Sequence, residues 1–222
     1  MAWFTQDALD FFAELELNNE RAWFEKNKKR YEASVKQPME AFAAEMISRM
    51  QQIDPRITML PKEAVFRIYR DTRFSKDKTP YKTNAGLSIS PGGKSDHSSG
   101  GVYFHLDARS MAVASGRYRP EPAEILAIRM YIASHIDEFA KLLEEPRFKA
   151  TFGTIAGEKN KVLPAELRDA ASRQPLIFNK QFFYWAEYDG KEALRDDLPD
   201  FVMMHVEVAR PMDQFLTRAS GS

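Results

Sequence analysis

Apolar residues recur every three or four positions in the first part of the chain, which is the spacing of one face of a helix. The run from Thr5 to Leu17 shows this spacing first, and Asn18 and Asn19 follow it with side chains that end and cap helices. The next run places three residues four positions apart: Trp23, Asn27 and Tyr31. Pro38 suits the first turn of a third helix. The apolar stripe of that helix consists of Phe42, Met46, Met50 and Ile53.

After Pro61 the apolar pattern changes from helical spacing to alternation, which is typical of strands. A first strand is expected from Val65 to Asp71, and a second around Leu87 and Ile89. A loop rich in glycine and serine follows from Pro91 to Gly101. The next alternation predicts a hairpin with apolar positions at Val102, Phe104, Leu106, Met111 and Val113. Together these strands predict a mainly antiparallel sheet.

The second half of the chain combines helical and strand patterns. After Pro122 a long amphipathic helix is expected, with apolar residues at Ile125, Ile128, Ile132, Ile136, Phe139 and Leu143. The region from Phe148 to Leu163 predicts a short helical turn and then an irregular connection. The aromatic stretch from Leu176 to Tyr188 favours a strand that returns to the sheet, with a helix as the alternative. From Leu198 to Leu216 we expect one helix, or two that are interrupted at Pro211.

These elements predict an α+β fold in which a mainly antiparallel sheet is flanked by N-terminal helices, a long central helix and C-terminal helices. The chain has 222 residues without repeats or a linker-like stretch, so we expect a single domain over residues 1–218 and a frayed tail at 219–222. The lack of cysteine excludes disulfides and thiolate metal sites and favours the reducing cytoplasm. No leader or membrane-spanning apolar run is recognised, so we expect a cytoplasmic protein without a membrane partner.

Charge is balanced over the whole chain but clustered within it. Lys and Arg together number 32, as do Asp and Glu, so no net field recruits nucleic acid or anionic lipid. Any such partner must be met by a local cluster. The strongest cluster runs from Arg67 to Lys82 and is called the basic segment below. It holds six cations and two carboxylates, a local charge of +4.

The basic segment supports three hypotheses. In the first, guanidinium forks and ammonium groups converge on an anionic small molecule, phosphorylated or carboxylated, at a binding or enzymatic site. The expected ligand-binding residues are Arg67, Arg70, Arg73, Lys76, Lys78, Tyr81 and Lys82. In the second, Asp71 and Asp77 pair with the arginines, and the segment is a self-paired clamp of a structural or protein-interaction domain. Nucleic-acid binding is the third, and the neutral overall charge makes it less favoured than the first.

Few residues are candidates for acid-base chemistry. Asp71 lies in the basic segment, and His105 shares a strand face with Tyr103 and Asp107, where Asp107 would orient the ring for proton transfer. No two of the four histidines have close metal-ligand spacing, and cations flank both Asp71 and Asp77, so we expect no metal site and no cofactor. The sequence carries no signal for an oligomeric state.

Residues over roughly the first two thirds of the chain resemble those of a known family. Five of them lie near the N-terminus: Asn18, Asn19, Trp23, Phe24 and Tyr31. With the basic segment they resemble the family catalogued as domain of unknown function 2461 (DUF2461). The resemblance continues through Tyr103, His105, Leu106, Gly116, Pro120, Glu121 and Pro122. It fades from Leu163 to Gln174, which lacks the glycine, aromatic residue and His-Pro pair that such proteins often carry. The resemblance implies a compact α+β fold and no established substrate.

Overall fold

The computed structural model describes residues 2–96 and 100–221, and this chain divides into two compact units. Unit 1 consists of Met1–Ile89, Tyr103–Val113 and Glu187–Met203. Unit 2 consists of Ser90–Val102, Ala114–Ala186 and Met204–Ser222. The chain passes from one unit to the other within strands. The expectation of one domain over residues 1–218 stays a prediction. Part of the expected loop from Pro91 to Gly101, including His97, lies outside the described residues.

The N-terminal helices of unit 1 meet through aromatic side chains. Helix α1 (Gln6–Leu17) ends where the sequence predicts and buries Leu9, Phe11, Phe12 and Leu15. The ring of Phe11 lies 5.6 Å from the ring centre of Trp23 and 5.6 Å from that of Tyr31. Both partners lie on the predicted face of the second helix. Aromatic contacts at this separation stabilise the pair beyond the burial of apolar area.

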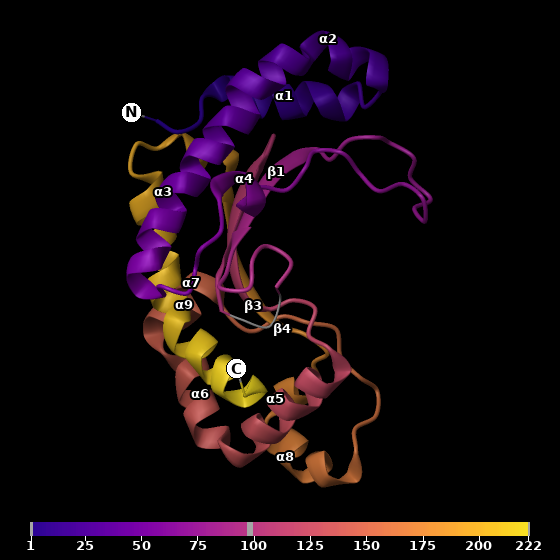
Figure 1. Ribbon diagram of the computed structural model, residues 1–222. Coiled ribbons are helices and arrows are strands. Elements are labelled where there is room, and N and C mark those ends of the chain that lie inside the picture. The colour runs from indigo at the N-terminus through magenta and orange to yellow at the C-terminus, as the bar shows by residue number, and fades with distance from the viewer. Residues whose placement is uncertain (1, 97–99, 222) are drawn as a thin grey trace. The chain divides into compact units, whose positions relative to one another are not determined.

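The prediction that Pro38 opens a separate third helix is wrong. Helix α2 (Arg21–Tyr31), the π-helical η1 (Glu32–Lys36) and α3 (Gln37–Ile53) form one continuous helix of 33 residues (Figure 1). A proline cannot donate a main-chain hydrogen bond, and its ring meets the carbonyl of the fourth residue before it. The wider turn of η1 directly precedes Pro38 and accommodates both effects. Three of the four positions of the predicted stripe of α3 are confirmed, since Phe42, Met46 and Met50 are buried, while Ile53 is half-buried.

The continuous strand predicted from Val65 to Asp71 is wrong. After the short helix α4 (Pro61–Ala64), this stretch is extended but forms isolated antiparallel bridges, which join Val65 to Leu87 and Tyr69 to Tyr81. Between the two bridges one side advances four residues and the other side six, so a continuous ladder cannot form. Residues 71–79 connect the two sides and are called loop 71–79 below. The loop projects away from α2 and β1 (Figure 1).

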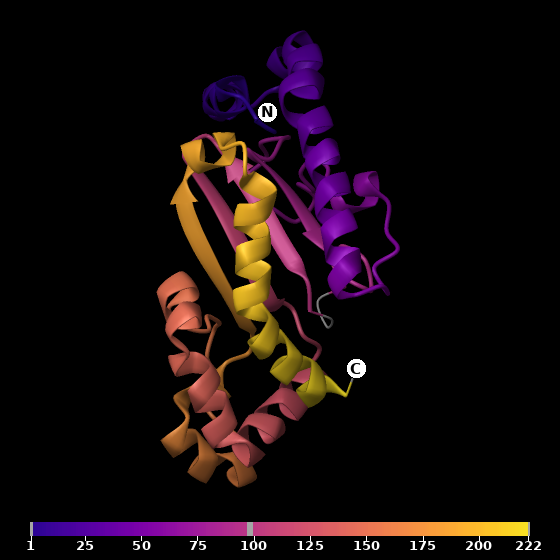
Figure 2. The ribbon, with the colours of Figure 1, turned by 90° about the vertical axis from the view of Figure 1, so that its left-hand side faces the viewer.

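The predicted fold class is confirmed by a four-stranded antiparallel sheet with helices on either side of it in the chain. The sheet order is β1 (Asn84–Ile89), β2 (Val102–Asp107), β3 (Ser110–Arg117) and β4 (Phe182–Asp189) (Figure 2). Strands β2 and β3 form the expected hairpin, and the aromatic stretch returns as β4. Gly116 has φ +102°, and a Cβ atom there would lie 2.3 Å from the carbonyl oxygen of Phe182. Glycine is therefore required where β3 approaches β4.

The long helix predicted after Pro122 is two helices. Helices α5 (Pro122–Ser134) and α6 (Ile136–Glu144) are separated by His135, whose φ of −130° and ψ of 40° are not helical. The Oγ atom of Ser134 lies 3.1 Å from the carbonyl oxygen of Met130, and His135 Nδ1 lies 3.0 Å from that of Tyr131. The N–H of His135 still bonds to the carbonyl oxygens of Tyr131 and Ile132, at 3.0 and 3.1 Å, and the helix ends at this residue although the apolar stripe continues.

The remaining elements follow the expected order. Helix α7 (Pro146–Phe152) is the predicted helical turn, and the short η2 (Ala165–Leu167), α8 (Arg168–Arg173), η3 (Pro175–Phe178) and η4 (Gly190–Leu194) were not predicted. Helix α9 (Leu198–Ser220) is one helix that contains Pro211 and continues into the expected tail (Figure 2). On both sides of Pro211 it buries apolar residues such as Ala209 and Met212, which offsets the lost hydrogen bond. None of the described helices is long and apolar enough to cross a membrane.

Unit 2 contains a network of polar side chains in its interior. Tyr184 is fully buried, and its hydroxyl donates to Asp213 Oδ1 at 2.6 Å. The Oγ atom of Ser115 lies 2.7 Å from Asp213 Oδ2 and 2.6 Å from the carbonyl oxygen of Gly101. Burial raises the pKa of Asp213, and the fully buried guanidinium of Arg117 partly opposes this effect. Polar groups in such a setting are stable when each has a hydrogen-bond partner.

Candidate functional site

The N-terminal helices fix the return side of the basic segment. The side chain of Asn19, between α1 and α2, donates from Nδ2 to the carbonyl oxygen of Tyr81 at 3.0 Å and accepts from its N–H at 3.1 Å. A neighbouring β-strand would make the same pair of bonds. The ring of Tyr81 is buried and stacks on Phe24, with ring centres 4.1 Å apart. Two residues of the family resemblance, Asn19 and Phe24, therefore hold Tyr81 in place.

Two acid-base pairs shape loop 71–79. The Arg73 guanidinium donates to both oxygens of Asp71, at 3.0 and 2.7 Å, and lowers the pKa of this acid to about 2. Asp77 accepts from Arg70 Nη1, and at 2.9 Å from both the N–H and the hydroxyl of Thr79. The Arg70 guanidinium and these bonds lower the pKa of Asp77 to about 2. Arg70 and Arg73 each have an acidic partner within the segment.

Unit 1 has a cavity of about 540 Å³ beside the base of loop 71–79. Its volume lies within the range of about 300–1,000 Å³ that is typical of small-molecule sites. The lining comes from the end of α1, the connection to α2, the basic segment and the first two strands. The lining residues are Glu16, Asn19, Arg70, Asp77, Thr79, Tyr81, Lys82, Thr83, Asn84 and Tyr103. This space is called the unit 1 cavity below.

The unit 1 cavity brings together part of the predicted anion site. Three of the seven expected ligand-binding residues line it: Arg70, Tyr81 and Lys82. The other four are not part of the lining: Arg67, Arg73, Lys76 and Lys78. Arg73 is turned to Asp71, and Lys78 Nζ donates to the carbonyl oxygen of Thr72 at 2.8 Å. The structure therefore narrows the candidate site to the base of the basic segment.

Four charged side chains line the unit 1 cavity, two acids and two cations. Glu16 is held by both terminal nitrogens of Arg109, at 2.9 and 3.0 Å. Such a two-point contact gives a carboxylate a fixed orientation as well as a counter-charge. The second acid, Asp77, is bonded to Arg70 as described above. The ammonium group of Lys82 lies 5.3 Å from the ring centre of Phe66, which places a cation over an aromatic face.

Several lining residues were missed by sequence reasoning. Glu16 lies on the polar side of α1, where an acid is usually solvated, and Asn84 begins β1 without a motif around it. Thr79 lies inside the basic segment but carries no charge. These residues meet through pairings between distant parts of the chain, which periodicity does not reveal. Asn19 and Tyr103 were named by the family resemblance, which is the signal that could have found them.

The two acid-base candidates, Asp71 and His105, are not part of the cavity lining. The ring of His105 lies 5.6 Å from that of Tyr103, and burial lowers its pKa. Its buried Nδ1 has no hydrogen bond to any described residue. The carboxylate of Asp107 accepts at 2.7 Å from N–H groups two and three positions further on and closes the β2–β3 turn, and its orientation of the His105 ring stays a prediction. Among the described residues, no cluster of three potential ligands could hold a metal ion.

Comparison with known proteins gives one family match. The family model described as Conserved hypothetical protein (DUF2461) matches residues 7–215. The match extends beyond the two thirds in which the sequence resemblance was recognised. It therefore includes the stretch from Leu163 to Gln174, although the glycine, aromatic residue and His-Pro pair are missing there. A search of curated proteins found no match.

Proposed function

We propose that this chain, which belongs to the DUF2461 family of conserved hypothetical proteins, binds an anionic small molecule in the unit 1 cavity. The observation that carries the proposal is that Arg70, Tyr81 and Lys82 line the same cavity of about 540 Å³. Guanidinium and ammonium groups recognise phosphate and carboxylate oxygens by the same charge-assisted hydrogen bonds. The ligand class is therefore a small molecule with a phosphate or carboxylate group.

The charges around the cavity favour an anion over a cation. The carboxylate of Glu16 is occupied by Arg109, and that of Asp77 by Arg70. The charged groups are the two acids Glu16 and Asp77, and the three cations Arg70, Lys82 and Arg109, of which Arg109 is the partner of Glu16. Their sum is one positive charge. An incoming cation would have to displace an arginine from its carboxylate before it could bind there. Arg70 and Lys82 line the cavity and can donate to phosphate or carboxylate oxygens.

The uncharged lining supports orientation of a ligand. Thr83, Asn84 and Tyr103 add hydroxyl and amide groups to the cavity wall. The amide of Asn19 is engaged by the main chain of Tyr81, so this residue shapes the cavity. Side chains that are held by such bonds before a ligand arrives lose less freedom when it binds.

A thermal-shift titration of wild-type protein with inorganic phosphate, pyrophosphate and citrate tests this proposal. A ligand at about 100 times its Kd stabilises the folded protein by about 2.7 kcal/mol. Lys82→Ala is expected to abolish that stabilisation. The matched controls Arg73→Ala and Lys76→Ala remove a positive charge from the same segment outside the cavity lining, and they should retain it. Sodium chloride at equal ionic strength controls for screening.

The outcomes separate a site from a diffuse charge effect. Equal losses in Lys82→Ala, Arg73→Ala and Lys76→Ala contradict the cavity proposal, because binding would then follow the net charge of the segment. The lack of a shift with every probe also counts against it. A steep salt dependence with a single-stranded oligonucleotide would instead favour the nucleic-acid alternative.

The paired acids of loop 71–79 support a second candidate, in which the basic segment is a self-paired clamp of a structural or protein-interaction domain. Asp77 bonds to Arg70 and twice to Thr79, and thereby connects the two ends of the loop. Under this hypothesis, Asp77→Asn lowers the protection of loop amides in hydrogen exchange. Lys82→Ala then changes neither that protection nor any ligand response. A ligand-induced stabilisation that Lys82→Ala abolishes would support anion binding in the unit 1 cavity over the clamp hypothesis.

A further inference from the structure

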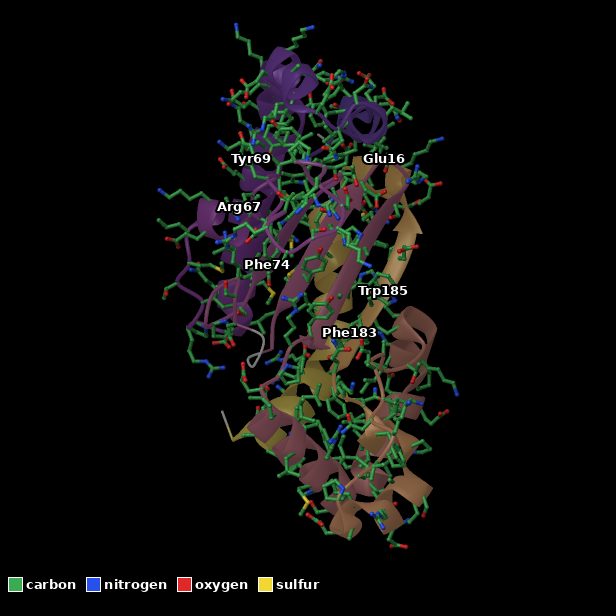
Figure 3. All side chains as sticks on the ribbon, turned by 90° about the vertical axis from the view of Figure 1, so that its right-hand side faces the viewer. Glu16, Arg67, Tyr69, Phe74, Phe183 and Trp185 are labelled. Carbon is green, nitrogen blue, oxygen red and sulfur yellow. The ribbon has the colours of Figure 1, made fainter. Side chains whose placement is uncertain are left out.

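Loop 71–79 presents the most exposed large apolar side chain among the described residues. Phe74 is 95% exposed, more than Leu17 at 87%. The loop projects from unit 1 in Figure 1, and Figure 3 labels Phe74 in the view from the side toward which the loop projects. A phenyl ring that stays in water forgoes the burial that stabilises most aromatic residues. Its position therefore points to a partner that covers it.

Positive groups surround this ring. The Arg73 guanidinium lies 5.8 Å from the ring centre of Phe74. Lys78 donates to the carbonyl oxygen of Thr72, two positions before Phe74 in the chain. Lys76 is exposed two positions after it. The only acids of the loop, Asp71 and Asp77, are already bonded to arginines, so the tip as a whole is cationic.

The loop is held in shape before any partner arrives. Its base is closed by the bond from Arg70 N–H to the carbonyl oxygen of Pro80, at 2.9 Å, and by the bridge between Tyr69 and Tyr81. Within it, Asp77 holds Thr79 and Asp71 holds Arg73. A preorganised tip loses little conformational entropy on binding, which suits it to a surface contact.

We propose that this tip binds the surface of an anionic lipid bilayer. Phe74 enters the boundary between headgroups and acyl chains, while Lys76 and Lys78 contact lipid phosphates. A lipid surface is favoured over nucleic acid because the loop offers one protruding ring. A single strand needs several stacking rings along a charged groove. The sequence expectation of no membrane partner rested on the lack of a spanning segment and a leader, and a surface contact requires neither.

Cosedimentation with vesicles tests the proposal. Wild-type protein should bind vesicles of phosphatidylcholine with phosphatidylserine and leave those of phosphatidylcholine alone unbound. Phe74→Ala should weaken binding about tenfold or more, since its transfer is the main apolar term. Lys76→Ala and Lys78→Ala should each weaken it about fivefold, with a loss that shrinks at high salt. Because these side chains are exposed, circular dichroism should show unchanged folding in every variant.

The chain offers matched controls in unit 1. Leu17→Ala removes an exposed apolar side chain from α1, and Lys28→Ala with Lys29→Ala removes two exposed cations from α2. These variants should bind as the wild type does. Because the chain contains no cysteine, a single environment-sensitive dye can be attached through Ser75→Cys, with Ala22→Cys as its control. A blue shift on anionic vesicles is expected for the first position alone.

Four results would overturn the proposal. The first is no binding of the wild type to phosphatidylserine vesicles, and the second is equal binding to both vesicle types. The third is an unchanged affinity in Phe74→Ala. The last is binding of a single-stranded oligonucleotide that depends on Phe74, without binding to vesicles. None of these outcomes depends on the ligand of the unit 1 cavity, so the two proposals fail separately.

Discussion

Burial favours the protonated form of Asp213 in unit 2, and the hydrogen bonds of Ser115 next to it show how that proton would be used. Ser115 Oγ lies 2.7 Å from Asp213 Oδ2 and 2.6 Å from the carbonyl oxygen of Gly101. A serine hydroxyl has one proton, so it can donate to one of these two acceptors. If Asp213 brings a proton of its own, it donates to Ser115, and Ser115 donates to Gly101. Tyr184 still donates to the other carboxyl oxygen.

The variant Asp213→Asn reproduces this protonated arrangement. Its amide nitrogen can donate to Ser115, and its oxygen can accept from Tyr184. We expect its free energy of unfolding to differ from that of the wild type by less than about 1 kcal/mol at about pH 4. Asp213→Ala instead removes the 2.6 Å acceptor of a fully buried Tyr184 hydroxyl. The expected loss is about 1–3 kcal/mol, the cost of a buried polar group without its partner.

The raised pKa of Asp213 fixes how the free energy of unfolding changes with pH. Burial raises the folded-state pKa of Asp213 above its ordinary value of 3.8, so the folded state binds the proton more tightly than the unfolded chain does. The resulting stabilisation is complete below the unfolded-state pKa and is lost as the pH rises through the folded-state pKa. Each unit between the two pKa values corresponds to about 1.4 kcal/mol. Asp213→Asn should therefore gain stability relative to the wild type as the pH rises.

Urea unfolding at a series of pH values measures this difference. Asp137→Asn, which changes an exposed acid of α6 in the same unit, is the control and should show a constant offset from the wild type. The reasoning is refuted if the wild type gains stability relative to Asp213→Asn as the pH rises. It is also refuted if Asp213→Asn is as destabilised at low pH as Asp213→Ala.

Three further predictions concern single positions. Asn19→Ala loses both main-chain bonds to the basic segment and should cost about 1–3 kcal/mol in urea unfolding, more than Asn18→Ala, which loses one exposed bond. Gly116→Ala should cost more than about 1 kcal/mol, and more than Gly153→Ala, because both have positive φ but a Cβ clash exists at position 116 alone. The pKa of His105, measured by NMR titration, should lie below its ordinary value of 6.5, because burial disfavours the imidazolium. Its contribution to stability is then lost as the pH falls. A value above 6.5 would mean that the nearby acids outweigh burial.

Elements whose pattern is local could be predicted from the sequence. Helix α1 ends at Leu17 because Asn18 and Asn19 follow its apolar face, and three of the four stripe positions of α3 are buried as expected. The hairpin of β2 and β3 also follows from alternation, since Phe104 and Val113 are buried at the expected positions. In each case the information lies within a few neighbouring residues.

Elements that are interrupted in the main chain were predicted less well. The alternation after Pro61 suggested a strand, but the two bridges of this stretch differ in register by two residues. The apolar stripe of the central helix continues past His135, but the main chain leaves helical dihedral angles at this residue and α5 ends. Periodicity describes which side of an element is buried, and these breaks arise in the main chain.

The sequence predicted the positive charge of the candidate site but not which residues line its cavity. Clustered cations pointed to Arg70 and Lys82, which line the unit 1 cavity. The same clustering could not tell them from Arg73, which bonds to Asp71 two positions away. Asn19 contacts Tyr81 across 62 positions of the chain, and no local pattern contains that pairing.

The π-helical stretch Glu32–Lys36 lies between the two halves of the continuous helix, so the number of residues in it sets how one half is rotated relative to the other. One residue corresponds to about 100° of rotation around an α-helix. Phe24 is buried before this wide turn, and Met39, Phe42 and Met46 are buried after it. Deletion of a single residue here would restore regular winding but would swing the downstream half by about a quarter turn. Substitutions in this stretch should be tolerated far better than deletions or insertions.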